Sequence, residues 1–235
     1  MPRRARRLGL EPDPTPPKQP LSTQRIVSAA LEQMRDKGYE GVSMRSVARA
    51  LDTGPASLYV HVSNRDDLDQ LVLDQVMRLV DLPEPDAERW QEQVRHVARG
   101  MLAVYRAHPG TARAALALVP VYEGGLRTTE GLLAILLQGG VPARPAAWFC
   151  DLLGLYVAAV AYEEVLWEQR EDGEGEESVV RRVADAFDQL PAGRYPVLAA
   201  NVAAMAAGEG DDRFEFGLDV LLGGLVTAGA RHAAG

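Results

Sequence analysis

The apolar residues of this 235-residue chain recur three and four positions apart, the spacing that gathers them on one face of a helix. Two such sets are Met44, Val47, Ala48 and Leu51, and Leu68, Leu71, Val72, Val76 and Leu79. No stretch shows the sustained alternation of apolar and polar residues that a half-buried strand requires. The sequence therefore predicts an all-α fold.

Cap and turn residues indicate where the helices begin and end. Helices are predicted from Ser22 or Thr23 to the residue before Gly38, at 43–51 and 55–62, from Asn64 to the residue before Pro83, and at about 88–107, 111–119, 123–138, 143–169, 178–190, 195–207 and 212–231. The segment 168–177, rich in carboxylates and glycine, is predicted to be a solvated loop.

Proline-rich and basic stretches divide the chain. Residues 1–20 hold six of the 15 prolines and a run of four arginines, with almost nothing to bury, so a disordered basic tail is predicted. A head is predicted at 21–66 and a larger helical body at 67–235. The tail either adds contacts to DNA or is only a solvated leader that raises nonspecific affinity.

The charge is distributed unevenly. Residues 1–65 carry 11 Lys and Arg against 6 Asp and Glu, a net charge of +5, whereas the remainder carries 14 against 27, a net charge of −13. Affinity for phosphates depends on where positive charge clusters, not on the total of −8. The basic head is therefore where contact with DNA is expected.

Two further features bear on the cellular setting. Cys150 is the single cysteine, so the chain has no internal disulfide. The longest apolar run, at 152–161, is shorter than the ~20 residues of a membrane-spanning helix, and no signal peptide opens the sequence. A soluble cytoplasmic protein without membrane contact is expected.

Residues 43–62 have the size and spacing of a helix-turn-helix, in which the second helix enters the DNA major groove. Leu58 and Val62 are predicted to face inward. The outer side is then left to small, hydroxyl-bearing and imidazole side chains, namely Pro55, Ala56, Ser57, Tyr59 and His61. Such side chains allow a close approach to DNA.

At this point the sequence resembles a known family. Gly-Tyr-Glu-Gly-Val-Ser-Met-Arg-Ser-Val-Ala-Arg-Ala-Leu (38–51), followed by Ala-Ser-Leu-Tyr-Val-His-Val-Ser-Asn-Arg-Asp-Asp-Leu (56–68), resembles the DNA-binding head of the TetR (tetracycline-repressor) family of transcription regulators. The last predicted helix, with Phe-Glu-Phe-Gly-Leu-Asp-Val-Leu-Leu-Gly-Gly-Leu (214–225), resembles the final helix of the tetracycline-repressor subgroup. The resemblance implies an N-terminal helix-turn-helix three-helix head joined to a helical-bundle body that binds an effector and dimerises.

The resemblance also implies roles for single residues of the head. Arg45 corresponds to a base-reading position, and its planar guanidinium suits guanine. Ala56 and Ser57 correspond to base-facing positions. Positions that contact phosphates are matched by Ser43, Tyr59, His61 and Arg65. Met44 stands where the family more often has Thr, so one backbone contact is absent from this set.

In the body, the resemblance implies an effector cavity. The polar and aromatic side chains proposed to line it are His96, Tyr105, His108, Trp148, Tyr156, Tyr162, Glu163 and Trp167. The alternative for each aromatic is a place in the core, the more usual role at helical spacing. No His lies within 111–119, so metal-dependent tetracycline binding is not expected, and neither a metal nor another cofactor is predicted.

The resemblance further implies that helices 143–169 and 212–231 build a homodimer interface as a four-helix bundle. The residues proposed for it are Phe214, Gly217, Leu218, Leu221, Leu222 and Leu225. Glycine in a helix costs about 1 kcal/mol relative to alanine, so several in one helix indicate close packing. The alternative is a glycine-rich helix buried within the monomer.

Together these features predict a ligand-responsive transcriptional regulator, most simply a repressor. As a homodimer it would bind a palindromic double-stranded DNA operator and be released by a small-molecule effector. One alternative is an effector-independent DNA-binding dimer. Another is a small helical enzyme, which the scattered histidines and the absence of a phosphate-binding glycine loop disfavour, so no catalytic residue is predicted.

Overall fold

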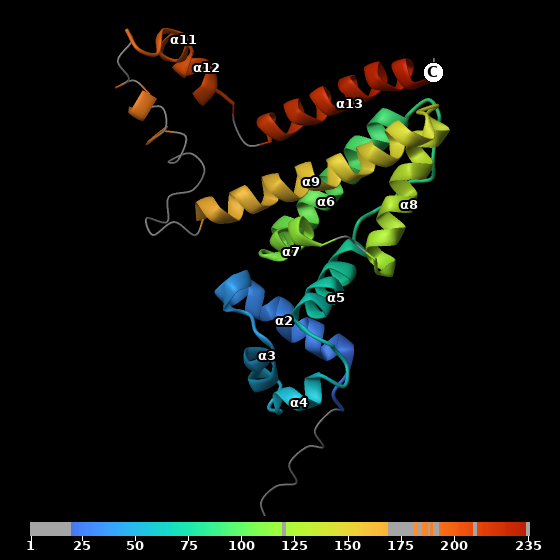
Figure 1. Cartoon of the computed structure of the whole chain (residues 1–235), viewed down its shortest axis with the longest axis vertical. Coiled ribbons are helices and arrows are strands. Elements are labelled where there is room, and N and C mark those ends of the chain that lie inside the picture. Colours follow the sequence, from blue (N-terminus) through green and yellow to red (C-terminus); the bar gives the residue numbers. More distant parts are fainter. Residues whose placement is uncertain are drawn as a thin grey trace, which may run out of the picture.

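The computed structural model describes residues 20–118, 121–168, 181–182, 185–187, 189, 193–208 and 211–233. Every regular element in those ranges is a helix, which confirms the all-α prediction (Figure 1). The predicted tail up to residue 19, residues 169–177 of the predicted acidic loop and much of the helix predicted at 178–190 lie outside the described residues.

The head contains the helices α2 (Thr23–Lys37), α3 (Met44–Ala50) and α4 (Pro55–Leu58) and the first part of α5 (Arg65–Met77). The predicted caps are confirmed. The side-chain oxygens of Ser22, Ser43 and Asn64 each accept a hydrogen bond from a backbone N–H in the first turn of α2, α3 and α5, respectively. The sequence pattern does not predict the short 3-10 helix η2 (Tyr39–Gly41) between α2 and α3.

Helix α5 joins the head to the body. Leu68 and Val72 belong to the hydrophobic core of the head, whereas Leu73, Val76 and Met77 belong to that of the body. The two sets follow one another along a single helix, so α5 is the structural link between the parts (Figure 1). The boundary predicted between 66 and 67 falls in its first turn.

The body is built around one long helix, α9. Its helices are α6 (Trp90–Ala107), α7 (Thr111–Ala117), α8 (Glu123–Gln138), α9 (Ala143–Glu168) and α13 (Asp212–Ala233). Helix α9 contacts each of the other four. It has the length and mean hydropathy, 1.4, of a membrane-spanning helix. Buried residues such as Leu153, Val157 and Ala161 account for part of this apolar character through packing in the core.

Ion pairs join α6 to the first turns of α13 and to Asp211, the residue before α13. The guanidinium groups of three arginines face carboxylates at N–O distances of 2.5–2.6 Å, as the pairs Arg95–Asp219, Arg99–Glu215 and Arg106–Asp211. Arg106 also pairs with Glu164 of α9 at 2.7 Å. These long side chains tie the start of α13, which packs on α9, to helix α6.

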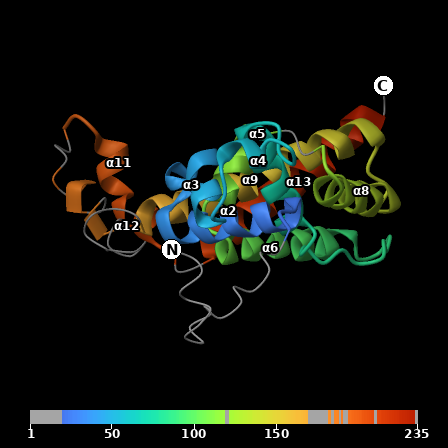
Figure 2. The ribbon, with the colours of Figure 1, turned by 90° about the horizontal axis from the view of Figure 1, so that it is seen from below.

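The single helix predicted at 195–207 is two short helices, α11 (Pro196–Ala200) and α12 (Val202–Ala206). They meet at Asn201, whose side-chain amide donates to the backbone carbonyl of Val197 at 2.7 Å. Asparagine side chains compete in this way for backbone groups and favour helix ends, which explains the break. Figures 1 and 2 show both helices to one side of the bundle.

Candidate nucleic-acid interface and ligand cavity

The helix-turn-helix consists of α3 and α4. Leu58 and Val62 are buried against the head core, as predicted. Arg45, Ala56 and Ser57 are exposed. Two helices at the tip of the head thus present a short surface from which side chains can enter a groove (Figures 1 and 2).

The residues that follow Leu58 continue this surface. The side chain of Tyr59 is 54% exposed and that of Val60 is 80% exposed, whereas His61 is half-buried. Val60 was not among the predicted contacts. An apolar side chain on the outer face can contact a thymine methyl group. Its sequence signal was weak, because valine is more often a core residue.

Ser43 caps α3 through a reciprocal pair of bonds. Its hydroxyl accepts from the backbone N–H of Ser46 at 3.1 Å, and its own N–H donates to the hydroxyl of Ser46 at 2.8 Å. The residue therefore fixes the start of the helix that carries Arg45. The contact with phosphate predicted for Ser43 remains a prediction, because a capping hydroxyl can still donate its proton.

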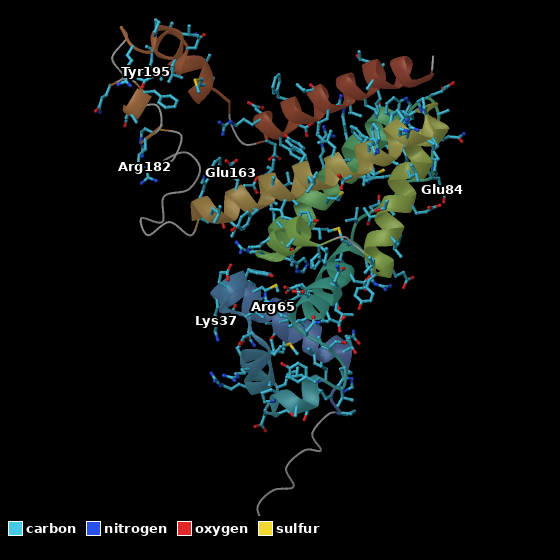
Figure 3. The ribbon with its side chains drawn as sticks, in the orientation of Figure 1. Lys37, Arg65, Glu84, Glu163, Arg182 and Tyr195 are labelled. Carbon is cyan, nitrogen blue, oxygen red and sulfur yellow. The ribbon has the colours of Figure 1, made fainter. Side chains whose placement is uncertain are left out.

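Arg65 lies in a bonded network within the head. Its guanidinium pairs with the carboxylate of Asp69 at 2.8 Å, lies 4.4 Å above the ring of Tyr39 and donates to the carbonyl of Val42. Tyr39 completes the network, because its hydroxyl donates to Asp69 at 2.6 Å. Figure 3 shows Arg65 close to the junction of head and body. Its predicted contact with phosphate thus competes with a structural role.

Burial changes the proton affinity of this network. Burial and the hydrogen bond to Asp69 raise the pKa of Tyr39 to about 12. Burial also raises the pKa of Asp69, although the bonds from Tyr39 and Arg65 oppose it. At neutral pH the phenol therefore stays protonated and can donate, which holds η2 against α5. Tyr39 and Asp69 are 30 positions apart, and no local pattern predicts the contact.

A cavity of about 450 Å³ opens between α5, α6, α7, α8 and α9. It is lined by Leu73, Met77, Met101, Tyr105, Ala115, Leu116, Ala117, Leu118, Gly125, Leu126, Thr128, Thr129, Leu132, Ala147, Cys150, Asp151, Gly154 and Leu155. The lining is mainly apolar with a few polar groups, the usual character of a small-molecule site.

The cavity differs from the predicted one in its residues. Of the eight side chains proposed to line it, only Tyr105 does so. Its hydroxyl points to the sulfur of Met77 at 3.9 Å. Small and aliphatic residues of α7, α8 and α9 form most of the walls. A cavity exists where side chains are too small to fill the space, and a search for aromatic and titratable residues does not find such positions.

The other seven proposed residues lie elsewhere. Tyr156 stacks on Phe214 of α13, with ring centroids 5.6 Å apart, and Tyr162 is bonded to Arg113 of α7 at 2.7 Å. Trp148 is 63% exposed on the outer side of α9. His96 is bonded to Asp81, His108 ends α6, Glu163 is exposed and Trp167 is half-buried, and none of them lines the cavity.

The residues proposed for the dimer interface mostly pack inside their own chain. The buried ones are Phe214, Leu218, Leu222 and Leu225, and Leu221 is half-buried. Gly217 faces the ring of Tyr156, where a Cβ atom would collide with the phenol. Burial of these side chains agrees with the alternative stated from the sequence, a helix packed within the monomer, and their place in a dimer interface stays a prediction. Close packing does explain Gly217, but against a helix of the same chain.

A different set of residues forms an exposed apolar face on α9 and α13. It contains Trp148, Leu152, Phe216 and Val220, each between 48% and 70% exposed. A Cβ atom added at Gly223 or Gly224 would meet no other atom within 4 Å, so another helix can approach there. A hollow of about 240 Å³ lies between the two helices on this face. This face lies on the same two helices for which the dimer interface is predicted, and that interface stays a prediction.

Two polar contacts join the cavity wall to the head. Arg113 of α7 pairs with Glu40 of η2, and Tyr122, the residue before α8, donates to Asp67 of α5 at 2.6 Å. Burial alone would raise the pKa of Asp67, but hydrogen bonds from Tyr122 and Ser63 outweigh it and lower that pKa. Both contacts lie next to the segments of α7 and α8 that line the cavity. A movement of these helices can therefore be transmitted to the head.

Among the described residues, no group of three His, Cys, Asp or Glu side chains is arranged to hold a metal ion. The two histidines of the body for which a place is described, His96 and His108, stand apart from the cavity.

Comparison with protein families gives two matches. Residues 26–70 match the family described as "Bacterial regulatory proteins, tetR family". Residues 82–228 match the family described as "Tetracyclin repressor-like, C-terminal domain". Together they span the helix-turn-helix, α6–α9 and nearly all of α13.

Named relatives agree with these matches. The chain is 30% identical over 220 residues to the HTH-type transcriptional repressor DrrR1 of Streptomyces coeruleorubidus, with 92% of this chain and 81% of the relative covered. The tetracycline repressor protein class D of Escherichia coli is 27% identical over 207 residues, with 87% and 89% covered.

Among solved structures, the Streptomyces coelicolor TetR family protein ActR in complex with (S)-DNPA has a TM-score of 0.80 and 35% identity, with 90% of this chain and 100% of ActR covered. ActR in complex with actinorhodin also has a TM-score of 0.80, with 36% identity and 89% and 97% covered. ActR is thus similar along nearly the whole chain and has been solved with small molecules.

Proposed function

The chain belongs to the TetR family of transcriptional regulators, and from this premise we propose that it is a homodimeric, cytoplasmic repressor released from a palindromic operator by a small molecule. The single observation that carries the proposal is the cavity of about 450 Å³, because its α7 and α8 walls adjoin the contacts of Arg113 and Tyr122 with the head. The site for a ligand and the site for DNA are thereby connected.

For DNA, we propose that the exposed face of α3 and α4 enters the major groove. Arg45 is the proposed base reader, with Ala56, Ser57 and Val60 beside it. Tyr59 and His61 are proposed to contact phosphates, in addition to the hydroxyl of Ser43. With few polar base readers on α4, sequence preference depends on Arg45 and on DNA shape.

For the dimer, we propose that the exposed apolar face of α9 and α13 packs on its copy in a partner subunit. A two-fold interface uses the same patch on both subunits, and the two exposed helices give four helices across it. The two recognition helices then lie in successive major grooves, about 34–36 Å apart. Exposed apolar side chains such as Phe216 and Val220 are the anchors of this interface.

For the effector, we propose that an apolar small molecule enters the cavity and shifts α7 and α8. The dimer then favours a spacing of the heads that no longer fits the operator. By linkage, the operator and the effector weaken each other's binding. ActR, which has been solved in complex with actinorhodin, supports the binding of a small molecule by a protein of this fold.

Selection of genomic fragments bound by the purified protein tests the proposal. The expected result is one enriched palindrome, which the protein binds with an affinity that falls steeply with salt. Gly154→Phe fills the cavity from a lining position where an added Cβ atom meets nothing within 4 Å, and we expect it to alter operator affinity without a ligand. Enrichment without a palindrome would argue against the proposed dimeric docking.

A second candidate is a dimer that binds DNA without an effector. If this candidate is right, neither Gly154→Phe nor any molecule that binds the cavity will change the affinity of the protein for its operator. The presence of an open cavity next to the head contacts favours the responsive repressor over this candidate.

A further inference from the structure

The cavity lining carries one carboxylate side chain, that of Asp151 on α9. None of the described residues that line the cavity is Lys, Arg or His. Burial raises the pKa of the Cys150 thiol to about 11, and burial also raises the pKa of Tyr105, so both stay neutral. The lining is therefore an apolar surface with a single negative charge.

Among the described residues, Asp151 has no partner in its own chain. It forms no ion pair or hydrogen bond with another residue in the described ranges. Two basic side chains of α7 and α8 are engaged elsewhere, since Arg113 pairs with Glu40 and Arg127 donates to the carbonyl of Val80 at 2.9 Å. Arg144 of α9 lies 5.9 Å from the centre of the Trp148 ring. Residues 66–235 also carry 14 Lys and Arg against 27 Asp and Glu, so the surrounding field reinforces the negative charge.

The two polar ends of the cavity differ in exposure. Asp151 is exposed, whereas Tyr105 is only 4% exposed. The Tyr105 hydroxyl has only the weak acceptor sulfur of Met77 at 3.9 Å, so its proton is available to a ligand oxygen or nitrogen. A ligand in the cavity can therefore accept a hydrogen bond from Tyr105 at the buried end and contact the carboxylate of Asp151 at the open end.

The negative charge and the apolar walls of the cavity favour a cationic ligand over a neutral or an anionic one. An anion would lose its hydration next to a carboxylate with no basic side chain to compensate it. A neutral molecule gains only from apolar burial. A cation with an apolar body gains both that burial and an ion pair, shielded from water on its cavity side.

Resting on the function proposed above, we propose that the effector is an amphiphilic cation: an apolar, ring-containing body with a protonated amine held by Asp151. The body lies among the aliphatic and methionine side chains of α5–α9, and a hydrogen-bond acceptor at its far end meets Tyr105. Asp151 is then the residue that sets the charge specificity of the regulator.

Three probes with one biphenyl body test this proposal: 4-biphenylmethylammonium, 4-biphenylmethanol and 4-biphenylcarboxylate. Their Kd values are measured by ligand-observed NMR titration of the full chain at low salt without DNA. We expect the ammonium probe to bind on the order of tenfold more tightly than the alcohol, and the carboxylate to bind more weakly than the alcohol.

Variants of the protein test whether Asp151 causes the preference for the ammonium probe. Asp151→Asn should weaken the ammonium probe by about tenfold and leave the alcohol within about twofold, which also shows that the cavity is intact. Glu163→Gln removes the same charge from the same helix outside the cavity (Figure 3), so it is the matched control and should leave the ammonium Kd unchanged. Gly154→Phe should weaken all three probes.

The outcomes separate this inference from the proposed function. If the alcohol or the carboxylate binds as tightly as the ammonium, or if Asp151→Asn leaves the ammonium Kd unchanged, the cationic effector is wrong. The effector-responsive function then still stands, provided that Gly154→Phe blocks the probes. If no probe binds, or if Gly154→Phe changes none of the Kd values, both proposals fail.

Discussion

Arg113 and Glu40 form an ion pair, with 2.9 Å between guanidinium nitrogen and carboxylate oxygen, that joins helix α7 of the body to the 3-10 turn of the head. The same guanidinium is bonded to the hydroxyl of Tyr162 on α9 at 2.7 Å and lies 5.3 Å from the ring centre of Tyr39. Only two residues farther along α7, Ala115 begins a run of cavity-lining residues. Arg113 is therefore placed to report a change in the cavity to the head.

Arg113→Gln is expected to weaken the coupling between cavity and operator. Residues between coupled sites typically alter the coupling free energy by about 0.5–2 kcal/mol. Stability should change by less than about 1 kcal/mol, because Arg113 and Glu40 are both largely exposed. The measurement is operator affinity with and without a saturating cavity-binding probe.

A double-mutant cycle tests whether Arg113 acts through its ion pair with Glu40. Glu40→Gln should lose the part of the coupling that the ion pair carries, and the double variant should lose no more than Arg113→Gln, because the ion pair is already absent from Arg113→Gln. Arg89→Gln, which removes an exposed pair with Glu92 at the start of α6, is the control and should retain full coupling. Full coupling in Arg113→Gln would rule out this route.

The ion pairs between α6 and α13 predict a dependence of stability on acid. Hydrogen bonds from Arg106 and Arg99 lower the pKa of Asp211 and Glu215, respectively, below the ordinary values. A lowered folded-state pKa contributes stability above the unfolded pKa of about 4, and this contribution is lost as pH falls through the folded value.

Arg99→Gln is therefore expected to be less stable than the wild type at pH 7 by roughly 0.5 kcal/mol, since the pair is largely solvent-accessible. The difference should disappear at an acidic pH below the lowered folded-state pKa of Glu215, where this carboxyl group is protonated in both proteins. Denaturant titrations at the two pH values measure this. A difference that persists in acid would assign the effect to packing of the arginine stem, not to charge.

The helices and their caps could be predicted from the sequence because both depend on near neighbours. The side-chain caps at Ser22, Ser43 and Asn64 each join residues three apart. The networks that position the head join distant residues, as Tyr39 and Asp69 do across 30 positions. Such contacts follow from tertiary packing, which periodicity does not encode.

The cavity and the apolar outer face could not be predicted for another reason. The apolar pattern of an amphipathic helix does not reveal which side its own chain covers and which side is left for a partner. On α13, Leu218 and Val220 are only two positions apart, yet the first is buried and the second is 55% exposed. The cavity likewise depends on what small residues such as Gly154 leave unfilled.

Arg45 and Arg65 are expected to differ when each is replaced by alanine. Arg45 is exposed, so Arg45→Ala should keep the free energy of unfolding within about 0.5 kcal/mol and relax base preference at one operator position. Arg65→Ala leaves Asp69, with a 3% exposed side chain, without its ion pair, at a cost of roughly 1–3 kcal/mol.

Denaturant unfolding combined with binding to operator variants separates the two roles. Arg65→Lys keeps the charge but not the planar guanidinium above Tyr39, so it should recover stability only in part. A uniform loss of affinity across all operator variants for Arg45→Ala would show that Arg45 contacts phosphates and reads no base.

The proposed dimer face can be tested at Val220. A carboxylate there meets its own copy or an apolar side chain across a two-fold interface, so Val220→Asp should convert the dimer into a monomer. Light scattering after size-exclusion chromatography measures the mass, and affinity for the palindrome should fall by at least about tenfold once the second head is lost.

Two controls make the result specific to that face. Val197→Asp places the same charge at an even more exposed valine on α11, outside the face, and should remain dimeric. Leu218→Ala removes a fully buried side chain and should cost about 2–5 kcal/mol of stability as a core defect, whether or not the chain dimerises. A dimer that survives Val220→Asp would place the contact between subunits elsewhere, because a buried, unpaired carboxylate is not tolerated at the centre of an apolar interface.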